Sequence, residues 1–95
     1  MGRVARQKPE HLAQKLKEIR EKLELSQGEL VIRLKLAESG VSRSSIAGYE
    51  LGIKEPSLFT ILAYARLANV IVDVLIDDEL TLPDRIPYLG TRPKF

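Results

Sequence analysis

Two helix starts and one helix stop fall within a single short stretch, residues 25–52. The first start is Ser26, whose hydroxyl can accept a hydrogen bond from a backbone N–H of the first turn, while Glu29 can accept one from the N–H of Ser26. Leu25 precedes this capping box and Leu30 follows it at the spacing of a hydrophobic staple. A helix is therefore expected to begin at this serine.

The same stretch predicts a second helix. Ser42 can cap it, with Val41 and Ile46 placed as another staple, and Gly52 suits the left-handed conformation that commonly ends helices. Because Gly40 can adopt that conformation too, the first helix is expected to end just before it, near residues 37–39. The two helices and their connection then have the organisation of a helix-turn-helix.

Rotation by about 100° per residue divides the second helix into two faces. One face carries the residues that can pack: Ser42, Ile46, Tyr49 and Glu50. The other face carries Ser44, Ala47, Gly48 and Leu51, with Arg43 at its edge. The first face is expected to lie against the rest of the domain, and the second to point outward.

Three motifs occur in order: SQGEL, VSRSSIAGYELG and EPSLFTILAYARLANV. Together they resemble the Xre/Cro-type (lambda-repressor-like) family of DNA-binding domains, and the resemblance covers roughly residues 12–76. It implies an all-α domain of five short helices that binds double-stranded DNA. Where the family usually has one glycine between the two central helices, this chain has KLAESG at 35–40, which predicts either a longer first helix or an enlarged turn.

The resemblance assigns sequence reading to four residues by motif position: Arg43, Ser44, Ala47 and Gly48. Of these only Arg43 can make a bidentate bond to guanine. Gly48 has two explanations, close approach of the backbone to the duplex or a short helix that frays, because glycine inside a helix costs about 0.8–1 kcal/mol relative to alanine.

The resemblance also implies contacts that position the domain on the DNA backbone. Gln27, at the start of a helix, is expected at a phosphate. The residues themselves add further phosphate candidates: Ser45, Tyr49, Lys54, Arg3 and Arg6. Ser45 and Tyr49 can also be packing residues, with a buried ring favoured for Tyr49, and Lys54 can be an ordinary surface lysine. A structural ion pair between Arg20 and Glu50 is implied as well; the alternative is two unrelated exposed charges.

The remaining chain divides into three parts. Residues 1–8 form a basic segment that is either an unattached tail or an arm following the DNA, residues 9–78 form the domain, and residues 79–95 form an extended C-terminal tail. Pro9 suits the first turn of the first helix. The apolar stripe of that helix is Leu12, Leu16, Ile19 and Leu23. The anchors of the tail are Ile86, Tyr88 and Leu89, and the acidic run 77–79 is expected to be solvated.

Pro56 and Ser57 open a fourth helix that Asn69 can close. Its expected inward face is Leu58, Ile61, Leu62, Ala65 and Ala68. The next segment, VIVDVLI at 70–76, resembles a strand by its β-branched residues, but the family pattern favours a fifth helix. Because it is apolar on nearly all sides, a homodimer interface is expected there, formed by Val72, Val74, Leu75 and Ile76.

Composition excludes several classes of protein. The chain has no cysteine and one histidine, His11, so neither a disulfide framework nor a metal or cofactor site is expected. No apolar run reaches the roughly 18 residues of a membrane span, and no signal peptide precedes the domain, so a cytoplasmic protein is expected. An enzyme is the least favoured class, since no convergent acid pair or Gly-rich phosphate loop is visible.

Charge is distributed unevenly. Residues 1–54 carry eleven Lys/Arg against seven Asp/Glu, whereas residues 55–95 carry four against six. The basic half contains the helix-turn-helix, as contact with phosphates requires. We therefore expect a sequence-specific transcriptional regulator, more specifically a repressor that binds an inverted repeat as a homodimer. The alternative is an antitoxin-like module that neutralises a protein partner and regulates itself through DNA binding.

Overall fold

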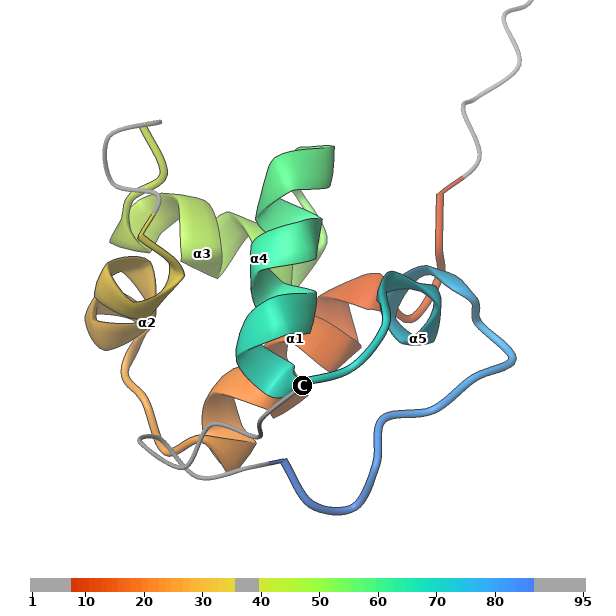
Figure 1. Ribbon diagram of the computed structural model, residues 1–95. Helices are drawn as coiled ribbons and strands as arrows, with labels where there is room; N and C mark the ends of the chain where they lie inside the picture. Colours follow the sequence, from red (N-terminus) through yellow and green to blue (C-terminus); the bar gives the residue numbers. More distant parts are fainter. Residues whose placement is uncertain (1–7, 36–39, 87–95) are drawn as a thin grey trace, which may run out of the picture.

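A computed structural model describes residues 8–35 and 40–86, and over these residues the chain is all helical (Figure 1). The helices are α1 (Leu12–Lys22), α2 (Gln27–Leu34), α3 (Arg43–Leu51), α4 (Leu58–Ala68) and α5 (Val72–Ile76). α1 contacts α3, α4 and α5, and α2 packs on α3 and α4. The expected all-α, five-helix architecture is confirmed, and the segment that β-branching alone favoured as a strand is the helix α5.

One hydrophobic core joins the five helices. The side chains that are completely or almost completely buried come from every helix: Leu16, Ile19, Leu30, Ile46, Tyr64 and Leu75. The whole apolar stripe expected in α1 is buried, from Leu12 to Leu23. Burying a large aliphatic side chain contributes about 1.5–3 kcal/mol, so this shared cluster is the main source of stability in a chain without disulfides.

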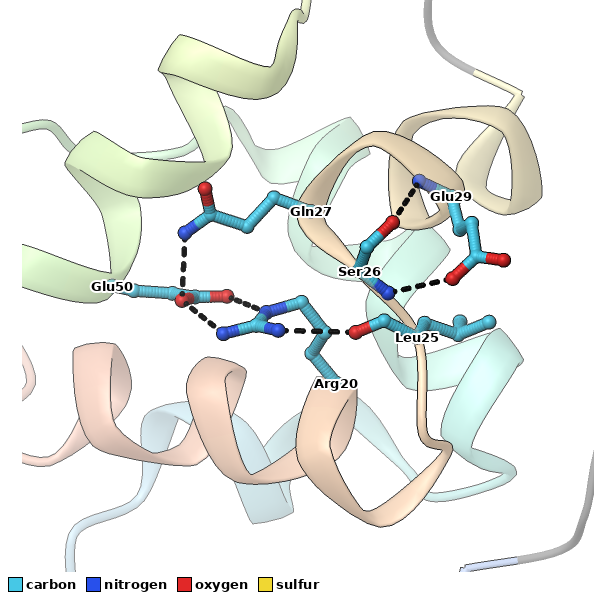
Figure 2. Close-up of polar contacts among 6 residues, drawn as sticks. All are labelled: Arg20, Leu25, Ser26, Gln27, Glu29 and Glu50. Atoms are coloured by element: carbon cyan, nitrogen blue, oxygen red, sulfur yellow. Dashed lines mark hydrogen bonds and ion pairs between the residues drawn. The ribbon is translucent and has the colours of Figure 1, made fainter.

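The predicted caps are present at both central helices. At α2, the N–H of Glu29 donates to Ser26 Oγ over 3.1 Å and the N–H of Ser26 donates to Glu29 Oε1 over 2.8 Å (Figure 2). At α3, Ser42 accepts from the N–H of Ser45 over 3.4 Å and donates its own N–H to Ser45 Oγ over 3.1 Å. Gly52 ends α3 with a φ of +76°. These caps satisfy N–H groups that have no partner within their own helix.

The predicted end of α2 is wrong. The helix ends at Leu34, and Lys35 takes the left-handed conformation with a φ of +56°. Leu34 is also the last buried residue of the α2 stripe, and Val41 re-enters the core after the turn. Gly40 is left-handed, with a φ of +87°, but as part of the turn. The departure at 35–40 therefore does not lengthen the helix; residues 36–39 lie outside the described residues.

The inward face of α4 is partly different from the expected one. Ile61, Ala65 and Ala68 are buried, and Ser57 and Asn69 delimit the helix as predicted. Leu58, however, is 82% exposed, because the first turn of α4 projects away from α1 (Figure 1). Tyr64 is completely buried and provides the bulk that was expected from the leucine.

A buried lysine fixes α5 against α1. The side chain of Lys15 is almost fully buried, and its Nζ donates to the carbonyl oxygens of Val74 (2.7 Å) and Asp77 (3.0 Å). The last carbonyls of a helix have no partner within it, so the ammonium both satisfies them and places a positive charge at the negative end of α5.

The acidic run after α5 is not simply solvated, contrary to expectation. The carboxylate of Asp78 accepts hydrogen bonds from the N–H groups of Glu10 (2.9 Å) and His11 (3.1 Å) at the start of α1. These two bonds lower the pKa of Asp78. His11 itself is exposed, as predicted for a residue at a helix start. Asp78 therefore ties the beginning of the domain to the end of α5.

The chain beyond α5 returns along α1. Ile86 is buried and Leu82 is partly buried against the core, as expected for the first of the three tail anchors. Lys22 Nζ, at the end of α1, donates to the carbonyl of Asp84 over 2.9 Å. The other two anchors, Tyr88 and Leu89, lie outside the described residues.

Candidate nucleic-acid interface

One side of the first half of α3 is exposed to solvent. Arg43 and Ser44 are exposed and Ala47 is partly exposed, whereas Ile46 and Tyr49 are buried against the domain. The division follows the helical period, since residues 46 and 49 lie three apart on one side. Among the side chains on the outward side, the guanidinium of Arg43 has the donor pattern that can read a guanine edge.

Gly48 does not lie on this exposed flank. It is buried, and a Cβ built on it would lie 3.0 Å from the Cβ of Lys54 and 3.4 Å from its Cδ. The carbonyl of Gly48 also accepts the N–H groups of Ile53 (3.1 Å) and Lys54 (3.2 Å). The helix continues to Leu51, so it does not fray at the glycine. The expected outward position is wrong because the lysine stem covers it.

The ion pair expected between α1 and α3 is present and bidentate (Figure 2). Arg20 Nε donates to Glu50 Oε2 over 2.7 Å, and Arg20 Nη2 donates to Glu50 Oε1 over 3.0 Å. Arg20 Nη1 donates to the carbonyl of Leu25 over 3.0 Å. The hydrogen bonds to the carboxylate raise the pKa of Arg20, although burial acts in the opposite direction. One guanidinium thus connects α1, the start of the helix-turn-helix and the end of α3.

Gln27 joins the same network from the first position of α2. Its Nε2 donates to Glu50 Oε1 over 3.2 Å, and Figure 2 shows the amide extending toward the carboxylate. A primary amide has two N–H donors, so this bond leaves one of them for another acceptor. The residue is partly buried.

Three of the expected phosphate residues lie around one pocket. This pocket has a volume of about 380 Å³ and lies between the start of α3 and the start of α4. Its lining residues are Gly40, Val41, Ser45, Tyr49, Lys54, Glu55, Ser57, Phe59 and Thr60. Ser45 and Tyr49 are buried, as their packing interpretation requires, whereas Lys54 is exposed. Arg3 and Arg6 lie outside the described residues.

The hydroxyl of Tyr64 is a buried polar group that was not predicted from the sequence. Tyr64 is completely buried, and its hydroxyl has no hydrogen-bond partner among the described residues. Burial and the nearby negative charge of Glu50 raise the pKa of this hydroxyl. The helical period could have located it, since Tyr64 lies three residues after Ile61 and four before Ala68, which are both buried.

The described residues form neither a metal-ligand cluster nor a membrane span. No group of three His, Cys, Asp or Glu side chains that could hold a metal ion occurs in residues 8–35 and 40–86. Within the same part of the chain, no helix has the length and hydropathy needed to cross a bilayer.

The comparisons with known proteins agree with this geometry. A family model described as helix-turn-helix matches residues 34–74, from the end of α2 into α5. Neither the curated proteins nor the solved structures include a significant match. This match makes residues 34–74 similar to the Xre/lambda-repressor-like helix-turn-helix family, which indicates a DNA-binding regulator.

Proposed function

We propose that this chain is a transcriptional repressor that binds an inverted-repeat operator as a homodimer, with α3 in the major groove. The observation that carries the proposal is the exposed flank of α3: Arg43 and Ser44 are exposed, while the opposite side of the helix is held in the core. A helix fixed on one side and free on the other is what insertion into a groove requires.

Base reading would rest mainly on Arg43. Its bidentate bond to guanine would contribute about 1–3 kcal/mol of discrimination, whereas Ser44 can bond to several bases and Ala47 can only touch a thymine methyl. With Gly48 covered, direct readout is sparse. Gln27 would hold a phosphate with its second amide N–H, and this contact would position the protein without specifying sequence.

The homodimer would form through the surface of α5. Leu75, which was expected there, is completely buried in the chain's own core and is excluded. The remaining candidates are Val72 and Val74, both partly buried, and Ile76, which is 46% exposed; Ile71, at the N-cap, is 65% exposed. A two-fold axis beside α5 would present two copies of α3 to successive major grooves, roughly 34 Å apart.

Selection of bound fragments from random duplexes tests the proposal. We expect an inverted repeat with a guanine in each half-site. Arg43→Ala should lose the preference for that guanine, Gln27→Ala should weaken binding to all sequences alike, and Arg66→Ala, an exposed arginine on α4, should change neither. Failure to enrich any sequence, or a preference unchanged by Arg43→Ala, would contradict the proposal.

A second candidate function is favoured by an apolar surface that adjoins the proposed DNA-binding flank. Four large apolar side chains between the end of α3 and the start of α4 are 72–82% exposed: Leu51, Ile53, Leu58 and Phe59. Exposed apolar groups of this kind often mark protein-binding surfaces. The candidate is an antitoxin-like module that neutralises a protein partner and regulates its own synthesis through DNA. Co-purification of one unrelated chain, lost on Phe59→Ser, would favour it over the simple repressor.

A further inference from the structure

We infer that Gly48 is a positioning residue for Lys54, and that its lack of a side chain sets the lysine where it neutralises a DNA phosphate. This inference rests on the proposed DNA-binding function and assigns to the glycine a role other than base reading. It starts from the contact between the two residues.

The contact is close along the length of the lysine stem. A Cβ on residue 48 would lie 3.0 Å from Lys54 Cβ, 3.4 Å from its Cδ and 3.8 Å from its Cγ. Two carbon atoms attract best at about 3.5–4.0 Å, so the first of these distances is repulsive. The contacted Cβ is fixed to the backbone and cannot swing aside as a side-chain end would. Alanine at 48 would therefore push the lysine and its backbone away from α3.

The backbone holds Lys54 in this place. The N–H groups of Ile53 and Lys54 both donate to the carbonyl of Gly48, over 3.1 Å and 3.2 Å. The chain leaves α3 through the left-handed Gly52 and folds back onto the helix one turn from its end. The loop after α3 is thus tied to residue 48 by two hydrogen bonds and by the packed stem.

This arrangement places the ammonium of Lys54 beside polar side chains at the edge of α3. Lys54 lines the pocket of about 380 Å³ together with Ser45, Ser57, Thr60 and the acidic Glu55. Its side chain is exposed, while its stem covers Gly48. When the outward flank of α3 enters the major groove, this edge faces the sugar–phosphate backbone of one strand, where an ammonium replaces a condensed counterion.

The salt dependence of DNA binding tests the role of the lysine. Each phosphate neutralised adds about 0.9 to the magnitude of the slope when the log of the DNA-binding constant is plotted against the log of the salt concentration. A dimer has two copies of Lys54, so Lys54→Ala should reduce that magnitude by about 1.8. We expect Gly48→Ala to lower it by a similar amount although it removes no charge. Arg66→Ala serves as the matched charge control and should leave the slope unchanged.

A double-variant cycle with Lys54→Gly isolates the side-chain contact, because that substitution removes the three lysine atoms nearest to a Cβ on residue 48 and keeps the backbone hydrogen bond. In this background Gly48→Ala should have no further effect on the slope and should raise the melting temperature, since alanine is the better helix former. Equal effects of Gly48→Ala in both backgrounds would overturn the inference. A salt dependence of DNA binding in the Gly48→Ala protein equal to that of the wild type would also overturn it.

The outcomes separate the inference from the proposed function. If the wild-type protein enriches no DNA sequence and shows no salt-dependent binding, the proposed function and the role of Lys54 both fail. If the protein binds a selected operator and only the coupling between residues 48 and 54 is missing, the proposed function stands and the inference about Gly48 is wrong.

Discussion

Replacing Arg20 by alanine removes three hydrogen bonds that join α1 to the helix-turn-helix. The guanidinium donates twice to Glu50 and once to the carbonyl of Leu25. The Glu50 side chain is only 5% exposed, and the arginine side chain 17%. After the substitution, the carboxylate keeps the amide of Gln27 as its donor among the described residues. A nearly buried negative charge is then left without its counter-charge.

The expected cost follows from that burial. Breaking a buried ion pair by removing one partner destabilises a protein by about 3–5 kcal/mol, and the partial exposure of Arg20 places this pair near the lower end. At about 4–8 °C per kcal/mol for a domain of this size, a loss of about 3 kcal/mol lowers the melting temperature by roughly 12–24 °C. Thermal unfolding followed by circular dichroism measures this shift.

Two comparison variants make the test specific. Arg66→Ala removes an exposed arginine and should change stability by no more than about 0.5 kcal/mol. The double variant Arg20→Ala/Glu50→Ala also removes the orphaned carboxylate, so its destabilisation should be smaller than the sum of the two single effects. Equal melting temperatures for Arg20→Ala and Arg66→Ala, or strict additivity in the double variant, would refute the clamp.

Two further predictions concern α5 and the segment after it. Leu75→Ala should lower the free energy of unfolding, measured with urea, by about 2–5 kcal/mol because the side chain is completely buried. Ile76→Ala should lower it by less than about 1 kcal/mol and should instead weaken self-association measured by sedimentation. A larger loss of stability for Ile76→Ala than for Leu75→Ala would contradict the assignment of Leu75 to the core. Asp78→Asn should reduce stability at neutral pH. The pKa of Asp78 is lowered in the folded protein, so its contribution is present above the unfolded value of about 3.9 and is lost as the pH falls through the folded value. The difference between Asp78→Asn and wild type should therefore shrink between about pH 5 and pH 3, and a difference constant over that range would refute the role of the carboxylate.

Local features of this fold were predictable from the sequence, because each depends on residues a few positions apart. The capping box at Ser26 and the left-handed ends at Gly52 and Asn69 follow from side chains within one helical turn of the helix ends. The apolar stripe of α1 follows from the helical period. The Arg20–Glu50 pair, 30 residues apart, was accessible only through the resemblance to a known family.

Other features were decided only by the tertiary structure, because they depend on groups that are distant in the sequence. Asp78 accepts N–H groups 67 and 68 residues earlier, and Lys15 Nζ reaches carbonyls 59 and 62 residues later. The sequence placed Leu58 on the inward face of α4 and Leu75 in a dimer interface, yet the core encloses Leu75 and Leu58 lies in a projecting turn. The capping residues thus determined where α2, α3 and α4 begin and where α3 and α4 end. The way these helices pack decided which side chains remained free to meet DNA, because burial depends on what the rest of the chain places against each residue.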